Sequence, residues 1–254
     1  MKIISVVNQK GGTGKTTTLL NLSSALADSG KRILLIDFDP QANASSGLGV
    51  RNAAKNVYDL LVGRASFFES LTKVKENLFL IPAAEQLAGA NIELVAEENR
   101  EFKLAKILEH LPQDYDFVFI DTPPSLGLLT INSLTAAHQA LIPVQAEYYA
   151  LEGLGQLIST IGLVKENLNP NLEIMGSIIT MYDDKVRLSH DVLEELYKNF
   201  PFMVFRTVIP RNVKLAEAPS FGKSIFEYAP KSSGARAYQR LAKEFLHLHN
   251  NIKS

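Results

Sequence analysis

The 254-residue sequence contains no cysteine. Disulfide bonds, thiolate chemistry and cysteine-ligated iron–sulfur clusters are therefore excluded. The sequence also lacks any run of about 18 apolar residues, the length that a membrane-spanning helix needs, and its first apolar run is too short for a secretory signal. We therefore expect a cytosolic protein without a membrane segment.

The net charge is also small, −1 at pH 7, but it is unevenly distributed. Residues 180–254 contain 12 Lys and Arg against 8 Asp and Glu, a net charge of +4, whereas residues 1–179 have a net charge of −5. This asymmetry allows a nucleic-acid-binding face in the C-terminal third of the chain. A solvated, mildly basic surface would give the same count.

Apolar segments alternate with helical patterns along the whole chain. The 46% of hydrophobic residues suffices for one large core, and no linker or repeat divides the sequence, so we predict a single domain over residues 1–254. Strands are predicted at residues 3–8, 32–38, 78–82, 117–121, 140–144, 174–181 and 203–209. Helices are predicted at residues 16–28, 86–97, 102–110, 126–137, 154–167, 189–199 and 234–248. This alternation is typical of an α/β fold with a mostly parallel, twisted sheet flanked by helices.

A glycine-rich loop joins the first predicted strand to the first predicted helix. It is a variant of the phosphate-binding loop, because Gln9 replaces the first glycine of the usual pattern. Its backbone NH groups can converge on phosphate oxygens, Lys15 can bind the outer phosphates, and the hydroxyl of Thr16 can ligate magnesium. The residues predicted to bind the nucleotide here are Lys10, Gly11, Gly12, Thr13, Gly14, Lys15, Thr16 and Thr17. The loop therefore predicts a nucleoside triphosphate with Mg²⁺.

Three carboxylates are predicted at the same edge of the sheet as this loop. Asp37 and Asp39 flank Phe38 at the end of one strand, and Asp121 ends another. Ligands of open parallel sheets bind beyond the carboxyl ends of the strands, where these side chains should meet the loop. We predict that Thr16, Asp37 and Asp121 hold Mg²⁺, in part through its water shell.

These groups are also sufficient for hydrolysis of a phosphoanhydride. The reaction needs in-line positioning of water and neutralisation of charge by Lys15, Mg²⁺ and a second cation. Lys10 is the candidate for that cation, since an ordinary phosphate loop does not require a lysine at this position. Of Asp37 and Asp39, one could orient metal-bound water while the other addresses the attacking water.

Five segments of the chain together resemble the ParA/Soj family of chromosome- and plasmid-partitioning ATPases, whose phosphate loop is a deviant Walker A motif. The segments are residues 10–17, 37–49, 121–127, 147–153 and 209–223, within a resemblance that extends from residue 2 to about residue 245. The last two segments are the most specific. The resemblance implies an ATP hydrolase with the fold of P-loop NTPases.

The resemblance also implies roles for individual residues. Family members form an ATP-sandwich homodimer, in which Lys10 would reach the phosphates of the partner and Gly11 would lie at the dimer seam. Asp39 would help to activate water, which makes Lys10, Lys15 and Asp39 the implied catalytic residues. Pro210 and Asn212 would flank adenine.

Family members bind DNA nonspecifically as ATP dimers and are released on hydrolysis stimulated by a ParB-type centromere-binding protein. The basic residues in the corresponding region are Lys185, Arg187, Arg211 and Lys214. Contacts to phosphates without reading of bases would make binding tolerant of sequence and steeply dependent on salt. The resemblance therefore implies DNA partitioning by a cytoplasmic, nucleoid-associated protein.

Two other functions share part of this pattern. A MinD-like ATPase acts on membranes and needs a C-terminal amphipathic anchor, but the apolar spacing within residues 238–248 is explained more simply by a helix packed on the sheet. We therefore predict no membrane contact. An ATP-gated DNA-binding regulator with vestigial hydrolysis is the second alternative, and the presence of both Lys10 and Asp39 argues against it.

Overall fold

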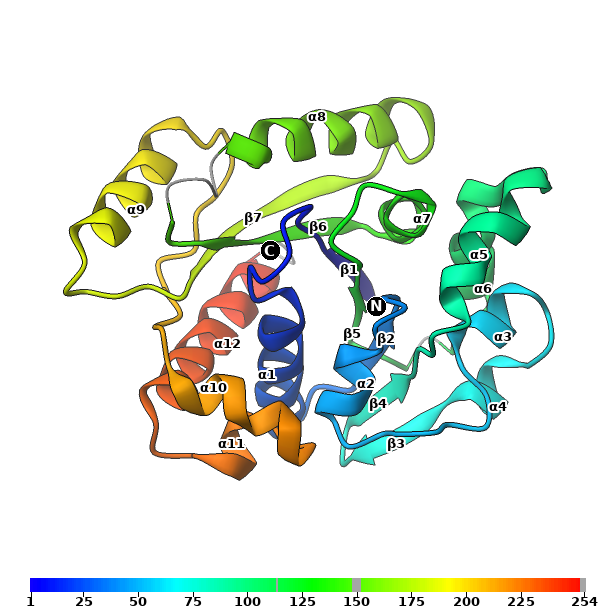
Figure 1. Ribbon diagram of the computed structural model, residues 1–254, viewed down its shortest axis with the longest axis horizontal. Helices are drawn as coiled ribbons and strands as arrows, with labels where there is room; N and C mark the ends of the chain where they lie inside the picture. Colours follow the sequence, from blue (N-terminus) through cyan, green and yellow to red (C-terminus); the bar gives the residue numbers. More distant parts are fainter. Residues whose placement is uncertain (113, 148–151, 252–254) are drawn as a thin grey trace.

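Seven strands form one sheet in the computed structural model, which describes residues 1–112, 114–147 and 152–251 (Figure 1). The strands are β1 (Lys2–Val6), β2 (Ile33–Asp37), β3 (Thr72–Lys75), β4 (Leu78–Ile81), β5 (Phe117–Asp121), β6 (Gln139–Gln145) and β7 (Glu173–Thr180). Their order is β3-β4-β2-β5-β1-β6-β7, and all neighbours are parallel except β3, which is antiparallel to β4. The predicted fold class is confirmed.

Helices cover both faces of this sheet. They are α1 (Lys15–Asp28), α2 (Asn43–Gly47), α3 (Val57–Leu61), α4 (Phe67–Ser70), α5 (Leu87–Glu93), α6 (Lys103–Glu109), α7 (Leu128–Ala136), α8 (Glu152–Asn167), α9 (Arg187–Asn199), α10 (Val213–Glu217), α11 (Ile225–Tyr228) and α12 (Ser233–Asn251). Figure 1 shows α1 and α12 on one side of the sheet and α7 and α8 on the other. Within the described ranges, no helix combines the length and the hydropathy that crossing a membrane requires.

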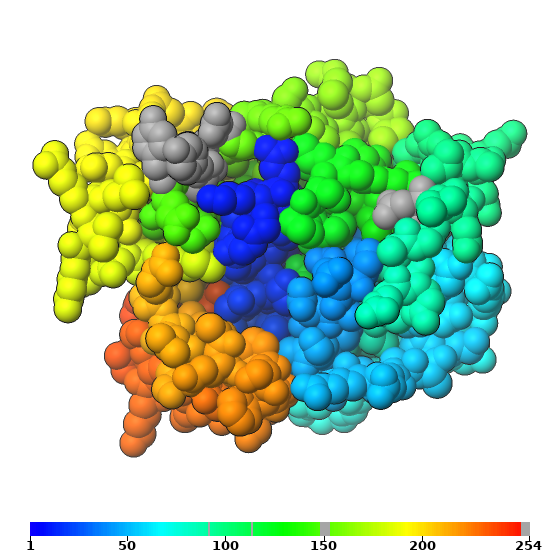
Figure 2. Space-filling view, in the orientation of Figure 1, coloured from blue at the N-terminus to red at the C-terminus, as the bar shows by residue number. Residues whose placement is uncertain are grey.

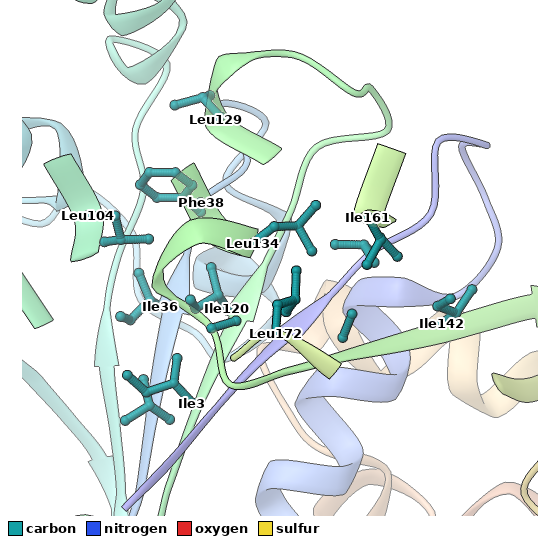
Figure 3. Close-up of a cluster of buried hydrophobic side chains, with 14 of the residues drawn as sticks. Ile3, Ile36, Phe38, Leu104, Ile120, Leu129, Leu134, Ile142, Ile161 and Leu172 are labelled. Carbon is teal, nitrogen blue, oxygen red and sulfur yellow. The ribbon is translucent and has the colours of Figure 1, made fainter. Parts of the chain in front are cut away.

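The central strands are buried on both faces, which explains their continuous apolar runs. Ile36 in β2 and Ile120 in β5 belong to the hydrophobic cluster under α6, α7 and α8, part of which Figure 3 shows. Their neighbours Leu35 and Phe119 point to the other face, where they join the cluster under α1 and α12. The apolar side of α12, including Phe245, packs into this second cluster, as predicted for the C-terminal helix.

The segment predicted as a strand at 203–209 is not a strand. It runs beside β7 and forms one isolated bridge, between Val204 and Ser177, and a second bridge joins the following Pro210 to Tyr182. Between these bridges, the NH groups of Arg206 and Thr207 donate to the carboxylate of Glu244 in α12, at 2.7 and 3.0 Å. A side chain thus replaces the strand ladder at these two residues, and nothing local in the sequence indicates this.

Candidate functional site

The glycine-rich loop lies between β1 and α1, at the carboxyl edge of the sheet. Gly12 and Gly14 have φ angles of 76° and 82°, which glycine adopts without strain. A cavity of about 540 Å³ lies over the loop and is lined by all of residues 11–17, with Asp39 and Met181 among the side chains that complete its wall. Figure 2 shows the N-terminal residues, in dark blue, reaching the surface at the middle of this face.

Thr16 and Asp121 meet beneath this cavity. The hydroxyl of Thr16 donates a 2.7 Å hydrogen bond to Oδ2 of Asp121, whereas Oδ1 of Asp121 is buried and has no hydrogen-bond partner among the described residues. Burial raises the pKa of Asp121 well above its usual range, and the nearby Asp37 raises it further. A divalent cation would both satisfy the orphaned oxygen and favour the ionised carboxylate, so these residues fit Mg²⁺.

Asp37 lies beside Asp121, because the two residues are in register on neighbouring strands. Both the backbone NH and the hydroxyl of Ser45 donate to Oδ2 of Asp37 at 2.7 Å. Burial raises the pKa of Asp37 to about 6, although the hydrogen bonds from Ser45 act in the opposite direction. The Ser45 hydroxyl also accepts a bond from the NH of Ala83 at 3.0 Å, so Ser45 fixes this carboxylate to the loop after β4.

Ser45→Ala is expected to lower the free energy of unfolding by about 1–3 kcal/mol, because it removes one hydrogen bond from the buried Asp37 and leaves the NH of Ala83 without its acceptor. Ser46→Ala on the same helix is the control, since that hydroxyl donates at 3.3 Å to the carbonyl of Asn43 at the surface. It should change the free energy by less than about 0.5 kcal/mol. Urea denaturation measures the free energy of unfolding of both variants. Equal values would mean that the hydrogen bonds of the Ser45 hydroxyl make no net contribution to stability.

Asp39 and Lys15 both line the cavity. Asp39 is 6% exposed, and its Oδ1 accepts a 3.0 Å bond from the NH of Gln41, which fixes the carboxylate at the cavity wall. Burial lowers the pKa of Lys15, whereas Asp121 and Asp39 raise it. Asp37 is held by Ser45 inside the fold while Asp39 lines the cavity, so Asp39 has the better position to address a water molecule there.

The side chain of Lys10 lies in a different environment from residues 11–17. Its Nζ lies 3.8 Å from Oε2 of Glu147, and it is absent from the described residues that line the cavity. The neighbouring Gly11 is exposed, and a Cβ atom added to it would come no closer than 3.8 Å to Pro124. A side chain at position 11 is therefore compatible with the fold of one chain.

The residues expected near adenine lie to one side of the phosphate cavity. Pro210 and Tyr182 line a second cavity of about 560 Å³. Tyr182 directly follows Met181, which lines the phosphate cavity. Asn212 caps α10: its Oδ1 accepts from the NH of Lys214 at 2.8 Å, and its Nδ2 donates to Ser233 at 2.6 Å. Both ends of the Asn212 amide are thus used within the fold.

The four basic residues expected to contact DNA lie in two places. Lys185 and Arg187 are exposed at the start of α9, and Arg211 and Lys214 lie at the start of α10, which Figure 1 shows apart from α9 on the same side of the molecule. Arg211 and Lys214 also face carboxylates, because Arg211 lies 3.4 Å from Glu147 and Lys214 lies 2.8 Å from Glu217. Segment 147–153 of the family resemblance is described only in part, since residues 148–151 are outside the described ranges.

Known proteins resemble this chain over nearly its whole length. A family model described as an AAA domain matches residues 1–174. The sporulation initiation inhibitor protein Soj of Bacillus subtilis is 54% identical over 246 residues, which cover 96% of this chain and 97% of that protein. Cobyrinic acid a,c-diamide synthase of Mycobacterium smegmatis, with bound ADP and magnesium, has a TM-score of 0.86 and 37% identity over 97% of this chain and 94% of that chain. A putative plasmid partition protein of Borrelia burgdorferi, bound to AMPPNP, has a TM-score of 0.83 and 27% identity over 97% and 98% of the two chains.

Proposed function

Since the chain belongs to the ParA/Soj family of chromosome-partitioning ATPases, we propose that it uses ATP hydrolysis to partition a chromosome or a plasmid. The family and the ATPase class predicted from the sequence are confirmed. The observation that carries the proposal is the cavity that gathers residues 11–17 and Asp39 above the Thr16–Asp121 pair. The higher identity of the Soj relative favours partitioning over the cobyrinic acid chemistry for which the Mycobacterium neighbour is named. We infer that residues 1–254 act as one domain, because all seven strands share one sheet.

ATP would place its phosphates in the cavity over the loop, against Lys15 and the NH groups at the start of α1. Nucleotide and magnesium are what the Mycobacterium neighbour contains. Thr16 and Asp121 would hold Mg²⁺, with Asp37 beside them acting through water. Bound Mg²⁺ would supply charge neutralisation at the phosphates, and Asp39 would orient the attacking water from the cavity wall.

The base would extend toward the second cavity, because Met181 and Tyr182 are adjacent and each lines one of the two. Pro210 would flank adenine there. The side-chain amide of Asn212 is engaged with Lys214 and Ser233, so its contribution would be to shape this wall by capping α10.

A homodimer would complete the site. The position of Lys10 outside its own phosphate cavity supports a role across a subunit interface, and the exposed Gly11 supports a place at the dimer seam. Each ATP would then be enclosed by two chains. Hydrolysis would remove the phosphate that holds the two chains together, so that they separate. A ParB-type partner would stimulate this hydrolysis.

The ATP dimer would bind duplex DNA through the basic surfaces at α9 and α10. Pairing two modest basic surfaces on one rigid platform raises the effective concentration of the second, which converts weak contacts into useful affinity. The net charge of +4 in residues 180–254 supports this placement. Such a dimer would act in the cytoplasm, on the nucleoid.

Two double variants test this DNA surface, Lys185→Ala with Arg187→Ala and Arg211→Ala with Lys214→Ala. Each is expected to weaken duplex DNA binding and to reduce the salt slope by about one unit for each DNA phosphate that the variant no longer neutralises. ATP binding should be retained. Filter binding at several salt concentrations gives the slope.

A matched control replaces two paired lysines elsewhere, Lys31, which lies 3.6 Å from Asp116, and Lys73, which lies 3.1 Å from Glu76. This control removes the same positive charge next to β2 and on β3, toward the end of the strand order away from β7, and should leave DNA affinity unchanged. If both test variants bind DNA as tightly as the wild type, the DNA surface lies elsewhere or does not exist.

A further inference from the structure

Glu147 lies between two cations from distant parts of the sequence. It follows β6, and its Oε2 is 3.8 Å from Nζ of Lys10 in the phosphate loop. Its Oε1 is 3.4 Å from the guanidinium of Arg211 and accepts a 2.7 Å hydrogen bond from Nε2 of Gln145. One carboxylate thus connects the phosphate loop with the segment before α10.

In this arrangement the Lys10 side chain lies beside Glu147, and Lys10 is not among the described residues that line the phosphate cavity. The backbone of Lys10 is fixed independently, because its NH donates to Oδ1 of Asn8 at 3.0 Å and its carbonyl accepts from the Thr13 hydroxyl at 3.4 Å. The loop therefore does not have to move when the ammonium group changes partner. Rotation of the side chain alone can exchange Glu147 for another anion.

The exposure of the three side chains determines how strong this contact can be. Lys10, Glu147 and Arg211 have side chains that are 38%, 44% and 58% exposed. Ion pairs this exposed shift an equilibrium by up to about fivefold. A multiply charged triphosphate attracts an ammonium group more strongly than one carboxylate does. The contact therefore favours the position of Lys10 beside Glu147 but does not prevent Lys10 from binding a phosphate.

We propose that Glu147 is a positioning residue that holds Lys10 away from phosphates in the nucleotide-free chain and releases it when the ATP dimer forms. The inference rests on the proposed function, because the phosphates that take Lys10 from Glu147 are those of the partner. After release, Arg211 no longer shares the carboxylate with Lys10. Closure of the dimer thereby changes the charge around a segment that we assign to adenine and DNA binding.

Glu147→Gln tests this role, because it removes the charge while keeping the size of the side chain. In a background with Asp39→Ala, which prevents turnover, saturating ATP should give a dimer dissociation constant about two- to fivefold lower than in the parent. Light scattering across a concentration series measures it. Glu217→Gln is the matched control, since it breaks the 2.8 Å pair with Lys214 and changes the net charge equally. It should leave the constant unchanged.

A second measurement detects the contact itself, which a merely structural role would not require. Lysines are dimethylated with ¹³C, and the Lys10 resonance is assigned with Lys10→Arg. In the nucleotide-free protein this resonance should shift on Glu147→Gln and stay in place on Glu217→Gln. The melting temperatures of both variants should match the parent, which excludes a general loss of fold.

The possible results separate this role from the proposed dimer. If the parent dimerises with ATP, but Glu147→Gln leaves the Lys10 resonance in place or dimerises no more readily, the role of Glu147 is overturned and the sandwich dimer stands. If the parent binds ATP and remains a monomer, the sandwich dimer is overturned, and the role of Glu147 with it.

Discussion

Asp39→Ala is expected to lower kcat for ATP hydrolysis by about 100-fold or more, the size of effect that removal of a group acting on the attacking water produces. ATP affinity should change little, because Lys15 and the loop NH groups provide the phosphate contacts. Asp39 is the carboxylate that lines the cavity, whereas Asp37 is turned inward and bonded to Ser45. Phosphate release at saturating ATP, together with binding of a fluorescent ATP analogue, measures both quantities.

Variants of the phosphate loop should fail in a different way. Lys15→Ala and Thr16→Ala are expected to lose nucleotide or magnesium binding first, so that ATP affinity falls along with turnover. Asp39→Asn keeps the size of the side chain but not its charge, and it should be as slow as Asp39→Ala. Wild-type turnover by Asp39→Ala with ATP bound would assign the water to another group, and Asp37 would be the first candidate.

The fold was predictable where burial is continuous. β1, β2 and β5 are buried on both faces, so their residues form uninterrupted apolar runs, and the long helices between them have enough turns to show a period. β3 and the short helices α2, α3, α4, α10 and α11 have four or five residues each. Such segments are too short for a periodic pattern. The helices α3, α4 and α11 begin with capping boxes, and Asn212 caps α10, so local hydrogen bonds define where these helices start.

The site was predictable where it is contiguous in sequence. The phosphate loop binds through its backbone, so the sequence pattern that predicts phosphate binding is contained in the single segment 11–17. All of these residues line one cavity. Ser45 and Glu147 lie within segments of the family resemblance, but neither residue type by itself predicts the contact that it makes. Ser45 matters because its hydroxyl joins Asp37 to Ala83, and Glu147 because β6 ends beside the loop, contacts that only the three-dimensional fold creates.

Gly11→Val is expected to raise the dissociation constant of the ATP dimer by about 30-fold or more, which corresponds to a loss of about 2 kcal/mol at the centre of an interface. Gly11 is exposed and next to Lys10, at the place proposed for the dimer seam. Three added carbon atoms there would hold two closely packed backbones apart. Light scattering with saturating ATP in the Asp39→Ala background measures the effect without hydrolysis.

The structure of the single chain explains why this variant should still fold and bind ATP. The nearest atom to a Cβ at position 11 is Cβ of Pro124 at 3.8 Å, an ordinary contact, and Gly11 is not among the glycines with positive φ. Gly162→Val in α8 is the control, because a Cβ there has no neighbour within 4 Å among the described residues. It should dimerise like the parent. A Gly11→Val chain that also dimerises normally would place the seam elsewhere, and an Asp39→Ala chain that binds ATP but stays monomeric would refute the sandwich dimer itself.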